Sequence, residues 1–191
     1  NYRDAMTYEN IVSKAPLYPL NSLMLHGICI AKNGNPSEMN NTTDDIRNEI
    51  HSYFGSGTGI QELYISWNLL NAEVWDIIAE SILWSRAKKN ILADTHWIGG
   101  DPAKGEVYGW AAWSNNKGTL TLRNPSDKSA TIQIDIAAAF ELPANAATRY
   151  MLKSPWKADA SKPGINSVAG KSIAIELQPF EVLTFDASAI K

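Results

Sequence analysis

The stretch DTHWIGGDP, residues 94–102, gathers residue types that hold metals or transfer protons. Asp94, His96 and Asp101 would supply two carboxylates and an imidazole, which bind a divalent metal or form an acid–base pair where a fold brings them together. The alternative is a joint between two domains, in which the glycines and the proline form a turn and the polar side chains bond to backbone groups. No third ligand of the right type stands at motif spacing. The joint is therefore the favoured interpretation, and neither a metal nor a cofactor is predicted.

Three other residues are candidates for contact with a sugar. His26 comes late in an apolar run, so its imidazole could meet a hydroxyl at the carboxyl end of a strand, or it could pack in the core and donate to a carbonyl. Trp67 and Asn68 directly follow a second predicted strand, where an indole could stack on a pyranose and an amide could bind a hydroxyl. Alternatively, Trp67 packs onto the next helix as a hydrophobic staple. These three are the predicted substrate-binding residues, and no catalytic residue is predicted.

The elements that would position these residues begin with an α/β pattern in the first half of the chain. NSLMLHGICI and IQELYIS read as buried strands, and a helical pattern with a cap at Asn41, Thr42 or Thr43 lies between them. A longer helix follows from an N-cap at Asn71 to Leu92, with apolar residues at three- and four-residue spacing. The predicted order is strand, helix, strand, helix.

After Pro102 the apolar residues alternate with polar ones, which is typical of an antiparallel sheet with one face exposed to solvent. The predicted strands are EVYGWAAW, TLTLRN, TIQIDI, SIAIEL and EVLTFDA, separated by turn signals, and residues 137–147 read as a loose connection. A β-sandwich follows from this pattern, with Ile132, Ile134 and Ile136 facing its core. Trp110 and Trp113 should lie on opposite faces, one in the core and the other under the helices of the first half or on a sugar-stacking platform.

Composition excludes several classes of partner. The chain has 191 residues, 45% of them hydrophobic, and seven tryptophans, which is ample for a buried core. A net charge of -3 and scattered basic residues argue against nucleic acid and acidic membranes. No apolar run approaches the roughly 20 residues that span a bilayer. The single cysteine, Cys29, allows no internal disulfide and is expected to be a buried filler.

Two strand–helix pairs are too few to close a barrel. An open parallel sheet of two strands would leave apolar faces in water, so the first half needs a partner. Either the partner strands belong to a longer parent chain, or residues 1–92 fold less regularly against the sandwich. The first ten residues, NYRDAMTYEN, contain no initiator Met and no secretory signal, and the chain is expected to be processed or excised from something longer.

Several segments resemble a known group of proteins. These are PLNSLMLHG, ELYIS, ILADTHWIGGDP, VYGWAAWSNNKGTLTLRNPS and LQPFEVLTFDA. They are similar to the C-terminal end of large bacterial glycoside-hydrolase-like proteins related to α-galactosidases, some of which carry the automatic label enterotoxin. The resemblance covers the chain from about Pro19 onward and implies a (β/α)8 barrel followed by an antiparallel β-sandwich.

The resemblance also implies which barrel strands this chain supplies and where the catalytic residues lie. The strands in NSLMLHGICI and QELYIS would be the seventh and eighth of the barrel. The family's catalytic carboxylates lie on the fourth and sixth strands, which would precede Asn1. The expected partners are thus a carbohydrate and the missing upstream catalytic region, and the expected location is extracytoplasmic.

The sequence therefore predicts three parts: residues 1–93 as the C-terminal part of an α/β barrel, residues 94–102 as the joint, and residues 103–191 as a β-sandwich. The first functional hypothesis is the C-terminal fragment of a glycoside-hydrolase-like protein that lacks its catalytic carboxylates. The second is a non-catalytic carbohydrate-binding or structural module.

Overall fold

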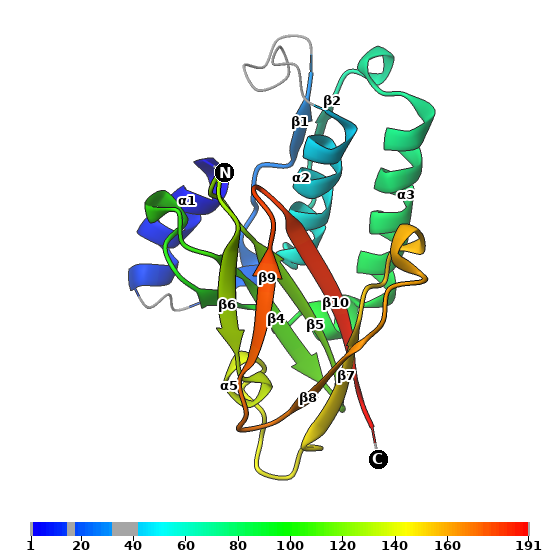
Figure 1. Cartoon of the computed structure of the whole chain (residues 1–191). Coiled ribbons are helices and arrows are strands. Elements are labelled where there is room, and N and C mark those ends of the chain that lie inside the picture. The colour runs from blue at the N-terminus through cyan, green and yellow to red at the C-terminus, as the bar shows by residue number, and fades with distance from the viewer. Residues whose placement is uncertain (1, 15–17, 32–41, 191) are drawn as a thin grey trace.

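A six-stranded antiparallel sheet forms the centre of the molecule (Figure 1). The computed structural model describes residues 2–14, 18–31 and 42–190. The strand order in the sheet is β3-β4-β5-β10-β7-β8. The bounds are β3 His96–Gly99, β4 Tyr108–Ser114, β5 Lys117–Arg123, β7 Arg149–Lys153, β8 Ile165–Val168 and β10 Val182–Ala189. The alternating pattern of the second half correctly predicted β4, β5 and β10.

A second, smaller sheet covers one face of the large sheet. It pairs β6, Ala130–Ile134, with β9, Ile173–Leu177, and the short helix α5, Ile136–Ala139, lies beside it. The core between the two sheets contains Leu120, Leu122, Ile134, Ile136 and Leu177. Ile132 packs against this core as well. The antiparallel sheets and their shared core fit the predicted β-sandwich.

The first half contains the predicted strand–helix–strand–helix order. Strands β1, Ile28–Ile30, and β2, Leu63–Ile65, are parallel. Helix α2, Thr43–Gly55, begins with a capping box at Thr42, and helix α3, Ala72–Ala87, is capped by Asn71. The core of this half gathers Ile28, Ile50, Phe54, Ile78 and Trp84.

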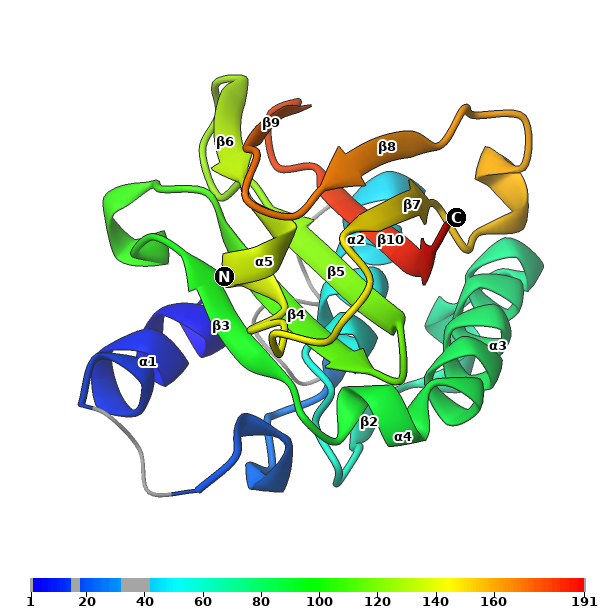
Figure 2. The same cartoon turned by 90° about the horizontal axis from the view of Figure 1, so that it is seen from below.

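The helices pack on the face of the large sheet opposite the small sheet (Figure 2). Helix α2 contacts β5 and β10, and the short α4, Lys89–Leu92, contacts β4 and β5. Helix α1, Tyr2–Asn10, was not predicted from the sequence. It contacts the large sheet through Asp4, which bonds to Tyr108 of β4. Short 3-10 turns complete the elements: η1 Val12–Lys14, η2 Leu20–Ser22, η4 Trp67–Leu69, η5 Pro102–Lys104 and η6 Lys157–Asp159.

The two tryptophans of β4 lie on opposite faces. Trp110 packs with Leu20 and Tyr108 on the helical side, whereas Trp113 packs against the sandwich core. The prediction that one of them lies under the first half is therefore confirmed.

Three sequence expectations were wrong. The sequence also predicts that Trp75 is shielded between the two halves, but Trp75 is 40% exposed on α3. Residues 137–147 do not form only a loose connection, since α5 begins at Ile136 with Asp135 as its cap. Cys29 is half-buried rather than fully buried, because it borders a pocket.

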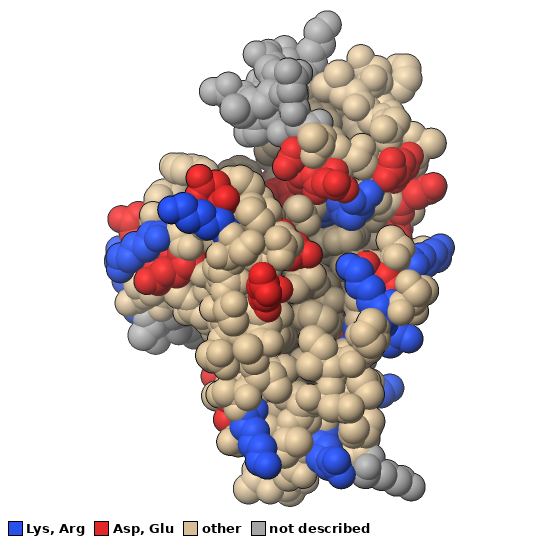
Figure 3. Space-filling model, viewed as in Figure 1, with Lys and Arg blue, Asp and Glu red and all other residues tan. Residues whose placement is uncertain are grey.

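The surface offers no strong charge pattern on the face shown in Figure 3, where acidic and basic side chains are interspersed. None of the helices in the described part of the chain is long and apolar enough to cross a membrane.

Candidate functional site

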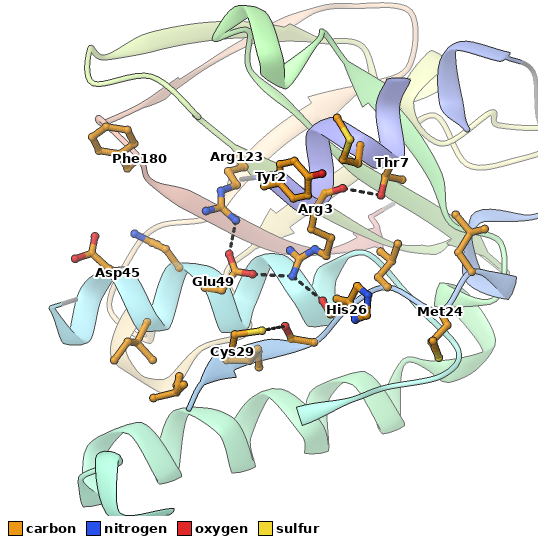
Figure 4. Close-up of a pocket in the computed structure, with 18 of the residues that line it drawn as sticks. Tyr2, Arg3, Thr7, Met24, His26, Cys29, Asp45, Glu49, Arg123 and Phe180 are labelled. Carbon is orange, nitrogen blue, oxygen red and sulfur yellow. Dashed lines mark hydrogen bonds and ion pairs between the residues drawn. The ribbon is translucent and has the colours of Figure 1, made fainter. Parts of the chain in front are cut away.

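A cavity lies between α1, strand β1 and the first half of α2 (Figure 4). Its volume is about 760 Å³. We call it the α1–α2 pocket. Most of its wall is apolar and includes Met6, Ile11, Leu23, Leu25 and Ile46. A cavity of this size and character is in the range that holds a small ligand or a short peptide segment.

The polar side of the pocket is a charged cluster of Arg3, Asp4, Glu49, Arg123 and Tyr108. The carboxylate of Glu49 bridges the two arginines, at 2.6 Å from Nη1 of Arg3 and 2.8 Å from Nη1 of Arg123. Beneath it, Asp4 accepts from Nε of Arg3 at 2.8 Å and from the hydroxyl of Tyr108 at 2.7 Å. The cluster joins α1 and α2 to the central sheet.

Burial and pairing fix the charge states in this cluster. Burial alone would raise the pKa of Asp4, but Arg3 and Arg123 outweigh it and the pKa is lowered. The pKa of Glu49 is lowered by the same two arginines against the same effect of burial. The pKa of Tyr108 is raised well above its usual value, by burial and then by the charge of Asp4. Both carboxylates are thus ionised and the phenol is neutral at neutral pH.

This arrangement is suited to holding elements together rather than to proton transfer. A general acid needs a pKa near the working pH, and the carboxylates of the cluster are shifted the other way. Each arginine is already engaged by a carboxylate, so neither offers an unpaired charge to an anionic ligand. The apolar wall is therefore the part of the pocket that remains open to an occupant.

His26 lies at the edge of this pocket but not at the strand end that the sequence indicated. Strand β1 begins only at Ile28, so His26 precedes it and lies near the amino end. Its side chain is 74% exposed, with Nδ1 3.5 Å from the carboxylate of Glu62. Gly27, the next residue, lies directly against the backbone of Glu62, where a Cβ would meet the Glu62 carbonyl, so His26 is held beside the residue that precedes β2.

Trp67 and Asn68 lie in the 3-10 turn that follows β2, at its carboxyl end, as predicted. Both are exposed, and Trp67 is 78% exposed, so it does not act as a buried staple onto α3. Glu62, the neighbour of His26, and Trp67 are five positions apart, which is roughly 16 Å of extended chain. The structure therefore brings Trp67 and Asn68 together and leaves His26 at the other end of the strands.

The residues of the 94–102 stretch point to different partners. His96 donates from Nε2 to the carbonyl of Ala139 at 2.6 Å, and Asp101 accepts from the backbone of Ala103. Asp94 is exposed. Within the described ranges, no group of three or more His, Cys, Asp or Glu side chains is placed to hold a metal ion. Residues 96–99 form strand β3 at the edge of the large sheet, and the proposed boundary at 94–102 stays a prediction.

Sequence reasoning missed the charged cluster. Arg3 and Asp4 lie in a helix that was not predicted, and Glu49 reads as an ordinary polar position of α2. The sequence did indicate which face of β5 carries Arg123. Leu120 and Leu122 face the sandwich core, and side chains alternate along a strand, so Arg123 lies on the opposite face. Thr121, on the same face, is buried against α2, where a Cβ on Gly55 would touch it.

No protein-family model matches the chain, and no curated protein sequence matches it. Solved structures with a similar fold are α-galactosidase-type glycoside hydrolases. α-Galactosidase from Saccharomyces cerevisiae has a TM-score of 0.57 at 9% identity, and α-galactosidase I from Mortierella vinacea has a TM-score of 0.53 at 11% identity. A GH27 β-L-arabinopyranosidase from Geobacillus stearothermophilus has a TM-score of 0.54 at 9% identity.

The matches cover most of this chain but only a minor part of each solved chain. They cover 80%, 83% and 92% of this chain, but only 45%, 39% and 37% of the respective solved chains. The chain thus spans less than half the length of these carbohydrate-acting enzymes. At such low identity the likeness shows a shared fold and carries no residue roles.

Proposed function

We propose that this chain is the C-terminal section of a glycoside-hydrolase-like protein that acts on carbohydrate. In this proposal β1–α2 and β2–α3 are the last two strand–helix units of a (β/α)8 barrel, and the β-sandwich follows them. The catalytic carboxylates belong to the upstream part of the same protein, which is extracytoplasmic.

One observation carries the proposal. A parallel strand pair with its helices, followed by an antiparallel sandwich, matches α-galactosidase-type enzymes over most of this chain and under half of theirs. Two parallel strands are too few to form a stable sheet by themselves. A barrel completed by further strands would bury their open faces.

Trp67 and Asn68 are the proposed sugar contacts, because they lie at the carboxyl end of β2, where α/β barrels gather their active sites. An exposed indole offers a flat apolar face for a pyranose ring, and the amide can bind a hydroxyl. His26 is not proposed for the same site, since it lies with Glu62 near the amino ends of the strands.

The second candidate function is a carbohydrate-binding module without catalysis. The exposure of Trp67 favours it, because the indole is accessible in this chain without any further domain. The two functions differ in whether a longer natural chain hydrolyses a glycoside.

The test begins with the reading frame upstream of Asn1. If it encodes a barrel, the longer chain should hydrolyse one of a panel of nitrophenyl glycosides. Trp67→Ala should then lower kcat/KM at least tenfold, whereas Trp75→Ala, which removes an exposed tryptophan from α3, should leave it unchanged. An inactive longer chain would refute the first function. Sugar binding to the 191-residue chain that is lost in Trp67→Ala would then support the second.

A further inference from the structure

The turn between β9 and β10 holds a phenylalanine in a strained backbone conformation. Gln178, Pro179, Phe180 and Glu181 form this turn, and the amide of Glu181 donates to the carbonyl of Gln178 at 3.1 Å. Phe180, the third residue, has a φ of 58°. A proline in second place and a positive φ in third place are the pattern of a type II turn, whose third position favours glycine or asparagine. A phenylalanine is therefore unfavourable for the turn itself, because its Cβ crowds the backbone in this conformation.

Neighbouring segments fix the turn in place. The side-chain amide of Asn124, which is buried, donates to the carbonyls of Lys128 and Gln178 at 2.8 Å and 2.9 Å. The backbone amide of Phe180 donates to the carbonyl of Ser126 at 3.0 Å. A strained residue persists only where its surroundings determine its conformation, and such residues gather at functional sites. The conformation of Phe180 is thus built into the fold.

The ring of Phe180 does not compensate for this strain by packing in a core. Phe180 is 52% exposed, and the core clusters formed by the described residues do not include it. Asn115 and Asn116 also have positive φ, but asparagine tolerates it. A local conflict without a packing gain is typical of a residue that has a function. The ring is therefore available for contact with another molecule.

Polar groups of α2 lie beside this ring. Phe180 and Asp45 lie at one end of the α1–α2 pocket, and His26 lies at the other end (Figure 4). Asn48 lines the pocket as well, and its Oδ1 accepts from the amide of Val182 at 3.2 Å, so its Nδ2 donor group makes no bond to any described residue. Asp45 uses Oδ2 in the helix cap and leaves Oδ1 without a bond to a described residue. One end of the pocket thus presents an aromatic face, an amide donor and a carboxylate acceptor.

This set of groups fits a neutral sugar. The apolar face of a pyranose stacks on an aromatic ring, and its hydroxyls bond to amides and carboxylates. The negative charges of Asp45 and Glu181 would repel a carboxylated or sulfated sugar, and Arg123 is already paired with Glu49. A purely apolar ligand would leave the amide of Asn48 without a partner.

We propose that Phe180, Asn48 and Asp45 form a binding site for a neutral carbohydrate between α2 and the β9–β10 turn. The site uses elements other than those that carry Trp67 and Asn68, and all of its side chains belong to this chain. The choice of a sugar as the ligand rests in part on the proposed function, whereas the exposed ring and its strained turn do not. Because the strain serves binding, a residue that suits the turn should remove the binding without destabilising the fold.

The test measures how strongly neutral polysaccharides in a native gel retard the 191-residue chain. The neutral probes are galactomannan, xyloglucan, arabinan and dextran, and polygalacturonate is the anionic comparison. Every protein in the test carries Trp67→Ala, so that Trp67 contributes nothing. At least one neutral polysaccharide should retard this chain, and Phe180→Asn should weaken the affinity at least tenfold. Phe180→Trp keeps an aromatic face and should keep the retardation, and the matched control Trp75→Ala, at an exposed tryptophan of α3, should leave it unchanged.

Two further measurements separate binding from folding. Asn48→Asp keeps an oxygen for the amide of Val182 but lacks the donor, so the affinity should fall at least tenfold. The melting temperature of Phe180→Asn should be equal to or higher than that of the parent, because asparagine tolerates the positive φ of the turn.

Four outcomes would overturn the proposal: no retardation by any neutral polysaccharide, retardation by polygalacturonate alone, full retardation of Phe180→Asn, or a lower melting temperature of Phe180→Asn. The last would mean that the ring contributes to folding. Retardation that depends on Phe180, together with an inactive longer chain, would refute glycoside hydrolysis and support this site. An active longer chain whose C-terminal section is not retarded would refute this site alone.

Discussion

Five side chains at and beneath the polar wall of the α1–α2 pocket hold the N-terminal helix on the central sheet. The cluster draws its members from α1, α2, β4 and β5. Asp4 and Tyr108 are buried, whereas Arg3, Arg123 and Glu49 are partly buried. Two cations and two anions balance in charge, so the cluster tolerates its burial only while it is complete. Its loss would release α1 from the central sheet.

We expect Asp4→Asn to lower the free energy of unfolding by about 3–5 kcal/mol, because it leaves two partly buried arginines with one carboxylate. Tyr108→Phe should cost less, about 1–3 kcal/mol, because it removes only the hydroxyl that donates to Asp4. Urea unfolding followed by circular dichroism measures both. Asp44→Asn, at an exposed acid of α2, is the control and should change little. An effect of Asp4→Asn no larger than that control would contradict this role.

His51 should make the stability of the protein depend on pH. Its ring stacks on Trp156, with centroids 3.9 Å apart, and burial followed by the positive charge of Arg47 lowers its pKa to about 3. The unfolded chain takes up the proton near pH 6.5, but the folded protein does not. The stabilisation is therefore complete above pH 6.5 and is lost as the pH falls toward 3, by about 1 kcal/mol per pH unit.

The measurement is urea unfolding at pH 7.5 and at half-unit steps down to pH 4.5. Above pH 4.5 the carboxylates of the charged cluster do not yet titrate, because their pKa values are lowered. His51→Phe keeps an aromatic ring against Trp156 and should flatten the pH dependence in this range. His96→Phe serves as the control, and an equal flattening in both variants would show that the dependence is not specific to His51.

At the scale of elements, apolar periodicity predicted most of the strands and both long helices. It failed where tertiary contacts hold an element that has a weak pattern of its own. Helix α1 buries only Asp4 and Thr7, which are polar, so its sequence carries no apolar stripe. Strand β3 was hidden in a turn-rich stretch, and it exists because Trp97 pairs with Trp110 and stacks on Tyr108. Such contacts join distant parts of the chain, and local patterns do not contain them.

The connection between β7 and β8 should be a main contributor to stability. Trp156 lies in it, crosses to the helices and packs between His51 and Trp84. We expect Trp156→Ala to cost about 3–5 kcal/mol in the free energy of unfolding, as the truncation of a large core residue does. Trp67→Ala removes an exposed tryptophan and should cost less than about 0.5 kcal/mol. Equal effects in thermal or urea unfolding would contradict the packing of this connection.

At the scale of the whole molecule, the two halves are joined by packing, a hydrogen bond and an ion pair as well as by the chain itself. Helix α2 packs on β5 and β10, the indole of Trp84 donates to Asp186 at 3.0 Å, and Lys88 pairs with the same carboxylate at 2.6 Å. Sequence periodicity predicted the two halves and their order. It could not predict these links or the α1–α2 pocket, because each depends on residues brought together from distant parts of the chain.

The last prediction is that the 191-residue chain by itself hydrolyses no glycoside. Retaining chemistry needs two carboxylates about 5 Å apart, and barrels place them at the carboxyl ends of strands. The described residues at the carboxyl ends of β1 and β2 include no acid; they are residue 31 after β1 and residues 66–71 after β2. Glu62 lies at the opposite end of the strands, and Asp4 and Glu49 are bound to arginines.

Release of nitrophenol from a panel of α- and β-glycosides should therefore stay at the rate of buffer alone. A longer chain that carries the proposed upstream barrel is the positive control in the same assay. Turnover by the purified 191-residue chain that disappears in Glu62→Gln or Glu49→Gln would contradict the prediction, because it would place a catalytic acid inside this chain.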